Sequence, residues 1–405
     1  MAVYTYIVRD PLGKKTKGQI NAVSERSAAD YLVSKGFFVT QIKSKETFDG
    51  WLEWEMPGSR VAADDFTMFY LQLGNMLDAG LSLIVALKTA QSHLENKKLI
   101  RVIGEITRSV EDGTSLSESM DRHPQMFPVL YRSMIRVGEA SGNLGKLLSS
   151  IASANDAKEE LKHQITSALA YPVVLMIASV GVVMFMMMWV IPAFVSVFEK
   201  ANIPLPLPTR IVVTISDFLK FHWGALFSLI AAAIIGFKLA LRLNPVKYKW
   251  DQFWLSVPVI GKLEKRIEVT RWGRNFSLML SSGIPILKAL EVSRALTTNA
   301  VFEETLRFAP DAVQIGGKLA SALERNSVFP SDVIQMVTTG ENSGTLDKML
   351  MKVADFYAQL VSRSLRKLTS VIEPIFILLM GGIVGFIMLS ILLPIFDMIK
   401  ILGSK

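Results

Sequence analysis

The chain contains one stretch twice, and this repeat constrains its fold more than any other feature. Residues 137–144 read Val-Gly-Glu-Ala-Ser-Gly-Asn-Leu, and residues 339–346 read Thr-Gly-Glu-Asn-Ser-Gly-Thr-Leu, an offset of 202. The same offset relates Phe127-Pro128 to Phe329-Pro330, Pro172 to Pro374, and Pro192 to Pro394. Upstream the offset is 203, which pairs Leu77, Gly80, Ile84, Ala86 and Leu87 with Leu280, Gly283, Leu287, Ala289 and Leu290. Self-similarity at a fixed spacing indicates a duplicated unit, here a helical module that leads into a membrane span, with one residue gained or lost inside it.

Three segments carry no Asp, Glu, Lys or Arg: residues 163–198, 221–237 and 374–396. A bilayer core about 30 Å thick needs about 20 apolar helical residues, and about 17 is the lower limit. The first and third segments meet this requirement, and Lys220 and Lys238 can reach the interfaces from the ends of the short second one. We therefore expect three membrane spans. The alternative for the second segment is a buried core helix, which residues 231–235 disfavour because they have no polar face.

The distribution of Lys and Arg beside the spans predicts their orientation. Nine flank the ends that face the repeats, namely Lys158, Lys162, Lys238, Arg242, Lys247, Lys249, Arg363, Arg366 and Lys367. Five lie in the other connection and the tail, namely Lys200, Arg210, Lys220, Lys400 and Lys405. The positive-inside rule then places both repeats and the N-terminus in the cytoplasm and the C-terminus outside it. The absence of cysteine fits this placement, because no disulfide framework is possible.

The net charge of +8 and the pI near 9.4 raise the question of a nucleic-acid partner. The basic residues concentrate beside the spans, where they face anionic lipid. No basic run interleaved with aromatic residues forms a nucleic-acid groove. We therefore expect a lipid membrane around the protein and no nucleic-acid partner.

Periodicity divides the chain into units. Residues 1–43 alternate polar and apolar positions around one helical stretch, which predicts a small strand-rich domain. From Asp64 the spacing becomes helical, with one apolar stripe at Phe66, Phe69, Leu73 and Leu77 and another at Leu99, Val102, Ile103, Ile106 and Val110. We expect a mainly α, polytopic membrane protein with two homologous cytoplasmic helical bundles, three transmembrane helices and a small α/β N-terminal unit. The expected order is the strand-rich domain (1–43), a linker (44–63), the first bundle (64–168), transmembrane helix 1 (169–194), an extracytoplasmic loop (195–220), transmembrane helix 2 (221–240), a cytoplasmic connector (241–270), the second bundle (271–372), transmembrane helix 3 (373–396) and an extracytoplasmic tail (397–405).

Prolines stand at equivalent places in the two copies. Pro172 and Pro374 lie where a soluble helix enters the membrane, and Pro192 and Pro394 lie near the far end of each span. An interior proline removes one backbone hydrogen bond and tends to kink the helix, so we expect each bundle to join its span at a set bend. The alternative for Pro172 and Pro374 is that the helix ends at the headgroup boundary.

Small residues recur four apart within two of the spans. Gly381 and Gly385 lie in the third span, and Ala232 and Gly236 lie in the second. This spacing puts small residues on one face of a helix and permits close helix packing. We expect packing inside one chain, with dimerisation as the alternative.

No residue pattern supports catalysis, a cofactor or a metal. The histidines are far apart and match no metal-binding spacing: His93, His123, His163 and His222. Gly316-Gly317-Lys318 and Gly145-Lys146 lack the spacing of a phosphate-binding loop. Ser141 and Ser343 lack the Gly-x-Ser-x-Gly spacing of hydrolases, and no span carries the charged residue that an ion-coupled transporter usually needs. We expect a protein that is not an enzyme.

The two Gly-Glu-x-Ser-Gly-x-Leu turns remain as candidates for function. In the structural interpretation, glycine closes one helix, Ser-Gly forms the turn, and the next helix starts with its leucine facing the core. In the functional interpretation, the turns contact a partner or loosely hold a cation through Glu139 and Glu341. The candidate contact residues are Glu139, Ser141, Gly142, Glu341, Ser343 and Gly344.

Several of these features together resemble a known family. They are the duplicated turn, Tyr171-Pro172 and Glu373-Pro374 before two spans, and Pro192-x-Phe194-x-x-x-Phe198 leading to Leu205-Pro206-x-Pro208-Thr209-Arg210. The N-terminal domain adds Tyr6, Asp10, Gly13, Gly18, Ala22, Ala29, Leu32 and Gly36. In nearly its whole length the chain resembles the type II secretion system F domain family, the inner-membrane platform proteins of type IV pili and type II secretion systems.

The resemblance implies a non-enzymatic platform that self-associates in the bacterial cytoplasmic membrane. It would present its bundles to a hexameric assembly or retraction ATPase and guide pilin or pseudopilin subunits into a fibre, together with other components of the machine. The second copy departs from the first, because Ala309-Pro310 and Gln314 replace the charged pattern around Arg108, Glu111 and Asp112. We therefore do not expect the two copies to make equal partner contacts. The rival hypothesis is a repeat-built transporter or pore, whose polar midplane segments this chain lacks.

Overall fold

The computed structural model describes residues 2–9, 15–22, 25–44, 61–200, 206–241 and 243–403, and it divides the chain into two units, Met1–Val61 and Ala62–Lys405. Most of the expected linker lies outside the described residues, and so do Asp10 and Gly13.

The N-terminal unit is a three-stranded antiparallel sheet with one helix. Its elements are β1 (Ala2–Arg9), β2 (Lys15–Ala22), α1 (Glu25–Ser34) and β3 (Phe38–Ser44), in the sheet order β2-β1-β3. The register of β1 with β2 is regular, while that of β1 with β3 shifts between Ile7 and Val8. Val8 from the sheet and Leu32 from the helix are buried. Gly36 follows α1 at a φ of +83°, a left-handed conformation that glycine adopts without strain.

The first repeat is a bundle of short helices closed by a long one. It comprises α3 (Ala63–Asp78), α4 (Leu83–Ser92), α5 (Lys97–Glu111), α6 (Leu116–Asp121), α7 (Val129–Ser141) and the first part of α8 (Leu144–Phe185). Both expected stripes face the core, with Phe69 and Leu73 fully buried in α3 and Leu99, Ile103 and Ile106 fully buried in α5. The α3 helix packs along α8, so the last helix of the bundle also carries its core.

The second repeat follows the same plan with one difference. It comprises α12 (Ile260–Ser281), α13 (Ile286–Leu296), α14 (Ala300–Arg307), α15 (Ala309–Gln314), α16 (Leu319–Glu324), α17 (Ser331–Ser343) and the first part of α18 (Leu346–Gly403). Here α12 packs along α18, as α3 packs along α8. The helix equivalent to α5 is broken into α14 and α15, because Pro310 stands at its middle and cannot donate a backbone hydrogen bond.

The structure locates the single residue by which the two copies differ in length. The connection from α6 to α7 runs from residue 122 to 128, and its counterpart from α16 to α17 runs from 325 to 330. The offset therefore changes from 203 to 202 in this connection, and the helices on either side keep their equivalence.

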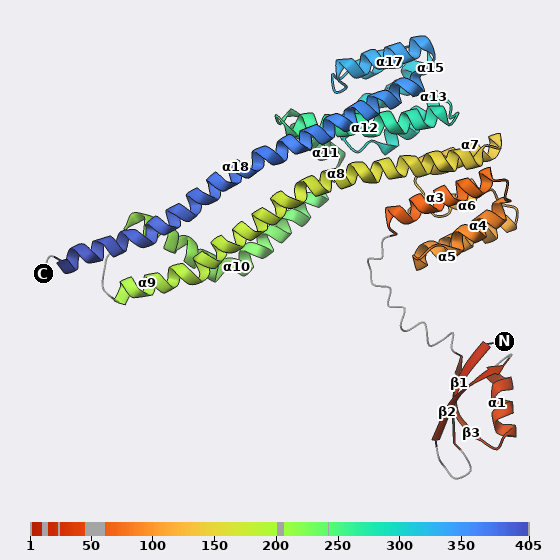
Figure 1. The fold of residues 1–405 in the computed structure, drawn as a ribbon, viewed down its shortest axis with the longest axis horizontal. Helices are drawn as coiled ribbons and strands as arrows, with labels where there is room; N and C mark the ends of the chain where they lie inside the picture. Colours follow the sequence, from red (N-terminus) through yellow and green to blue (C-terminus); the bar gives the residue numbers. More distant parts are fainter. Residues whose placement is uncertain are drawn as a thin grey trace. The chain divides into compact units, whose positions relative to one another are not determined.

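Two helices continue from the bundles as candidate membrane spans (Figure 1). One is Leu144–Ser196, made of α8, a π-helical turn η1 (Met186–Val190) and α9 (Ile191–Lys200), and the other is Leu346–Phe396 within α18. Both helices run on through Pro172 and Pro374. The alternative that the helix ends at these prolines is therefore wrong, and each bundle shares one continuous helix with its span.

The segment between the first span and the second repeat is largely helical. After α9, the helix α10 (Leu207–Ala240) and then α11 (Asn244–Ser256) lead into α12. Residues 195–220, expected as a loop, are thus mostly helix. Leu207–His222 and Phe227–Ala240 meet at a bend of 70°, and they form a third candidate span only if the bent pair is counted as one.

The two repeats pack on each other beside the long helices. Leu161 of α8, Ile267 of α12, and Val361 and Leu365 of α18 form a buried group, which we call the junction cluster. The Ser362 hydroxyl also donates a hydrogen bond to the Gln164 side chain. The two repeats are therefore in direct contact through these residues.

Candidate functional site

Each repeated turn places a glutamate at the start of a short helix in the same repeat. The Glu139 carboxylate accepts the backbone N–H groups of Leu116 and Ser117, at 2.5 and 3.1 Å, at the N-terminus of α6. In the second copy, the Glu341 carboxylate accepts from Leu319 and Ala320, at 2.6 and 3.1 Å, at the N-terminus of α16. A helix N-terminus has unpaired N–H groups and a partial positive charge, so a carboxylate there stabilises it. The glutamate of each turn is a capping residue for a helix about 22 positions earlier in the chain.

The two glycines of each turn have different roles. Gly138 and Gly340 lie inside α7 and α17, and an added Cβ would come within 3.1 Å of Leu144 and 2.9 Å of Leu346. The helices end instead at Gly142 and Gly344, whose φ angles of +72° and +68° are left-handed. The expectation that the first glycine closes the helix is therefore wrong, because that glycine serves the close approach of the next helix.

The contacts of Glu139 and Glu341 bear on the partner hypothesis. Both side chains are half-buried and hold backbone groups of their own repeat. Ser141, Gly142, Ser343 and Gly344, in contrast, are exposed at the tips of the turns. A partner that binds these turns would therefore contact the exposed tips rather than the carboxylates of Glu139 and Glu341. Among the described residues no group of three His, Cys, Asp or Glu could hold a metal ion.

The equivalent prolines Pro192 and Pro394 each leave one backbone carbonyl without its helical partner. In an α-helix, residue 394 would donate to the carbonyl of Ser390, but proline has no N–H. Before Pro192 the helix is in π register, in which Ile191 donates to the carbonyl of Met186. The next donor in that register would be residue 192, serving Met187, and again proline cannot donate.

Hydroxyl groups of α10 take the place of both missing donors. Thr209 Oγ1 donates to the Ser390 carbonyl at 2.6 Å, and Ser216 Oγ donates to the Met187 carbonyl. Both side chains are buried, at 4% and 1% exposure. They are seven residues apart, which places them on one face of α10 two turns from each other. Two prolines created by duplication are thus served by one helix that the duplication did not include.

Apolar side chains surround these hydrogen bonds. Met187 and Ile191 from the first long helix, Val212 from α10 and Ile387 from α18 form a buried group, which we call the span cluster. An unpaired carbonyl in such surroundings is costly, so the two hydroxyls fix where α10 can lie on the other helices. Sequence reasoning missed Thr209 and Ser216. Their spacing of seven beside two equivalent prolines was the available signal.

The prolines expected to bend the helices near the bundles lie beside a contact between the copies. The Tyr171 hydroxyl donates to the Glu373 carboxylate at 3.4 Å, and these two residues occupy equivalent places before Pro172 and Pro374. Pro172 is buried and Pro374 is exposed. The set bend at each proline stays a prediction.

The expected glycine packing within one chain is absent from the described part of the structure. No atom of another described element lies within 4 Å of the position that a Cβ would take at Gly381 or Gly385. Gly236 of α10 is equally open. Within the described residues, no other element covers these small faces.

A groove of about 460 Å³ runs between the two repeats, bordered by α7, α8, α12 and α13. Its lining is mainly apolar and includes four cations, Lys158, Lys162, Arg271 and Arg274. Three of them form ion pairs within the chain: Lys162 with Glu159, Arg271 with Glu268 and Arg274 with Asp355, at 2.7, 3.5 and 2.8 Å. Three of the four positive charges on the groove are thus paired with carboxylates of the same chain.

One carboxyl group of α12 has a raised pKa. Burial raises the pKa of Glu264 in α12, and the neighbouring Glu268 and Asp251 raise it further, while Arg271 and a hydrogen bond from Asn299 act in the opposite direction. Asp251 and Asn299 already cap α14, because each accepts a backbone N–H at its start. This acidic group therefore stabilises the joint between α11, α12 and α14.

Comparison with known proteins identifies the repeat independently. A family model described as type II secretion system (T2SS), protein F matches residues 69–192 and again residues 272–394. A second model, type II secretion system protein F, N-terminal domain, matches residues 1–43. Each match of the first model covers most of one bundle and nearly all of the long span that follows it.

Whole-chain relatives are similar throughout. The chain is 34% identical to the type IV pilus assembly protein PilC of Thermus thermophilus over 418 aligned residues, covering 100% of this chain and 99% of the relative. It is 30% identical to PilC of Myxococcus xanthus, covering 98% and 95%. It is also 30% identical to the type II secretion system protein F of Pseudomonas aeruginosa, covering 100% of both.

Proposed function

This chain belongs to the type II secretion system protein F family, and from that premise we propose that it is an assembly platform in the bacterial inner membrane. The fibre that it serves is a type IV pilus or a type II secretion pseudopilus. Its relatives are named for both systems.

The platform is proposed to act without chemistry of its own. No group of three His, Cys, Asp or Glu in the described residues could hold a metal ion, and the half-buried carboxylates of Glu139 and Glu341 accept backbone N–H groups at helix starts. A protein of this kind can transmit movement but needs an external motor, which we propose to be a cytoplasmic hexameric assembly or retraction ATPase. Pilin or pseudopilin subunits and other inner-membrane components are the further proposed partners.

The observation that carries the proposal is the continuity of α8 and α18. The helix α18 runs from the core of its bundle to the far side of its span, and α8 continues through η1 into α9 in the same way; neither α8 nor α18 ends at its proline, Pro172 or Pro374. The junction cluster ties the two helices together between the bundles and the spans. A displacement of the bundles is therefore carried to the membrane by two joined helices.

Three spans are proposed, with both bundles in the cytoplasm and the C-terminus outside. Contact between the bundles supports this count, because the first span carries the chain away from the bundles and the second repeat lies back against the first. The chain must therefore return across the membrane, and α10 is the long helix available between residues 206 and 241. Its bend of 70° does not prevent a crossing, since buried hydroxyls and neighbouring helices stabilise broken spans.

Self-association is proposed through the open small-residue faces. Gly381 and Gly385 meet no other described element, and such faces favour close contact between membrane helices. The exposed turn tips at Ser141, Gly142, Ser343 and Gly344 are proposed as contacts for the motor.

The test breaks the continuity of α18 in the bacterium that carries the gene. Three glycines inserted after Ser370 should abolish the fibre or secretion while the protein still reaches the membrane, because each glycine disfavours helix by about 1 kcal/mol. The same insertion after Leu94, in the connection between α4 and α5, is the control and should preserve assembly. Electron microscopy of fibres and the profile of secreted proteins are the measurements. Normal assembly with the first insertion would refute transmission through α18, and normal assembly after deletion of the gene would refute the platform.

The second candidate is a repeat-built transporter or pore. The open small-residue faces leave room for an oligomer with a central path. Solute uptake by vesicles containing the purified protein, driven by a proton gradient, would favour it over the platform.

A further inference from the structure

The helix α11 has one side fixed to the second bundle. Asp251 accepts the backbone N–H of Ala300 at 2.8 Å and so caps α14. The turn into α12 is tight, because Val259 has a φ of +75° and an added Cβ at Gly261 would lie 2.2 Å from the Leu255 carbonyl oxygen. The direction of α11 relative to the bundle is therefore set by Asp251 near its middle and by the tight turn after its C-terminus.

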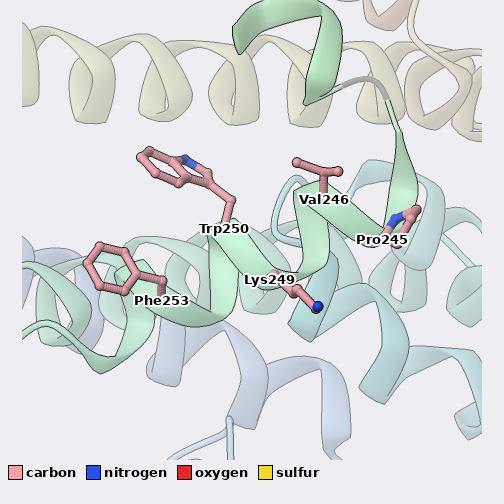
Figure 2. Close-up of a pocket in the computed structure, with 5 residues that line it drawn as sticks. All are labelled: Pro245, Val246, Lys249, Trp250 and Phe253. Atoms are coloured by element: carbon pink, nitrogen blue, oxygen red, sulfur yellow. The ribbon is translucent and has the colours of Figure 1, made fainter.

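The other side of α11 is apolar; apart from a contact of the Trp250 ring with Phe237 of α10, it is exposed at Val246 and Phe253. Figure 2 shows an open hollow on it of about 500 Å³, lined by Pro245, Val246, Lys249, Trp250 and Phe253, with Trp250 and Val246 pointing to the same side. Phe253 is 58% exposed, and an exposed patch of neighbouring large apolar side chains indicates a surface that contacts something else. No residue of α11 is fully buried. Because Trp250 and Phe253 are three residues apart, they share one helix face, while Asp251 and Gln252 lie on other faces.

The position of this face in the chain indicates what covers it. The helix begins four residues after Ala240, where α10 ends, and the Trp250 ring lies 4.7 Å from the Phe237 ring of α10 at 73°. An apolar face bordered by Lys247 and Lys249 is therefore held against the end of a proposed span. Aromatic side chains next to lysines at the end of a span are typical of the membrane interface.

We propose that α11 lies in the headgroup region of the cytoplasmic leaflet, with Val246, Trp250 and Phe253 among the lipid chains and Lys247 and Lys249 at the phosphates of anionic lipids. The proposal rests on the three-span arrangement above, since α10 must end at that leaflet. A membrane is favoured over a protein partner because the face is continuous with a span and carries the charge that anionic lipid attracts. The helix then holds the second bundle at a fixed height above the bilayer.

The test uses cysteines introduced into a chain that has none. Phe253→Cys and Gln252→Cys, both at exposed positions, are labelled with bimane in full-length protein reconstituted in phosphatidylcholine and phosphatidylglycerol nanodiscs. Brominated lipid should quench the probe at 253 at least threefold more than the probe at 252, and aqueous iodide should show the opposite order. Equal quenching at the two positions would overturn the proposal. Access of iodide but not of lipid to position 253 would overturn it too, since the face would then be open to water in the nanodisc, as expected if it is kept for a protein partner that the nanodisc lacks.

A second arm tests the charges. Replacing Lys247 and Lys249 together with Gln should abolish the increase in lipid quenching at position 253 that phosphatidylglycerol produces, whereas Lys262→Gln, at an exposed position of α12, should leave it intact. An unchanged response in the double variant would contradict the role of the lysines. The arrangement of spans is scored separately in intact cells by the labelling described below, so a misplaced α11 and a wrong span count give different results.

Discussion

At the scale of single residues, Glu139 and Glu341 hold the two shortest helices beside the repeated turns. Each of these helices has six residues, too few to persist on its own amide hydrogen bonds. In α6, Ser115 accepts the N–H of Glu118 while Glu139 accepts the two N–H groups before it. The first three backbone N–H groups of α6, those of Leu116, Ser117 and Glu118, therefore all donate to side chains.

We expect Glu139→Lys to destabilise the protein by about 3 kcal/mol, because two charge-assisted hydrogen bonds are lost and a cation is placed at a helix N-terminus. Glu139→Gln keeps an acceptor and should cost about 1 kcal/mol. Ala140→Lys, at the exposed neighbouring position, is the control and should be nearly neutral. Thermal unfolding of the purified protein in detergent measures all three, and equal midpoints for both lysine variants would contradict the capping role.

This capping role changes how a charge reversal at the turns is interpreted. From the sequence alone, Glu139→Lys is expected to change only the charge of a surface turn and to leave folding intact. In the structure the same change disturbs the packing of α6 on α7, so loss of assembly in such a strain does not by itself reveal a partner contact. Substitutions at the exposed Ser141 and Ser343 test the contact more directly.

At the scale of helices, the position of α10 depends on two backbone N–H donors that the neighbouring helices lack at Pro192 and Pro394. Its N-terminal half contributes Val212 to the span cluster and a hydroxyl to each carbonyl that Pro192 and Pro394 leave unpaired. The charge-free runs of the sequence predict where the long helices lie. They do not predict this arrangement, because a threonine or serine that serves a carbonyl on another helix looks like any other small polar residue.

We expect Thr209→Val to destabilise the membrane part by about 1–2 kcal/mol, because it keeps the side-chain shape and leaves the Ser390 carbonyl unpaired. Thr214→Val, on the same helix, removes a hydroxyl that is bonded only to its own backbone at Arg210 and should have little effect. Adding Pro394→Ala to Thr209→Val should recover most of the loss, since residue 394 then donates to Ser390. Unfolding midpoints in detergent give the comparison, and failure of the second substitution to rescue would show that the hydroxyl acts otherwise.

At the scale of the whole molecule, contact between the bundles constrains the path of the chain. Two bundles on the same side, joined through a span, require a second crossing between them. We expect Asn202→Cys to react in intact cells with a membrane-impermeant thiol reagent and Gln314→Cys not to react. Gln314 is exposed, which makes it a better probe of the second bundle than the buried Asn299. Labelling at both positions, or at 314 alone, would overturn the orientation that the counts of basic residues predict.

The repeat, the apolar stripes and the family can be predicted from the sequence, because each leaves a periodic or repeated pattern along the chain. The sequence does not predict the break between α14 and α15 as a structural event, although Pro310 marks the place. Nor does it predict the direction of Glu139 and Glu341, because the helices they cap lie more than twenty residues earlier. Contacts between distant segments set these features, and a single sequence shows the residues but not the meeting point.

The two prolines also determine where the membrane part separates most easily. The bonds within α8 and α18 are internal to each helix and survive any sideways movement, whereas Thr209 and Ser216 hold α10 by one hydroxyl each. Moving α10 away breaks two side-chain bonds and opens the span cluster while every helix stays intact. The face of α10 that carries Thr209, Val212 and Ser216 is thus a seam, along which another apolar helix could be admitted without unfolding the protein.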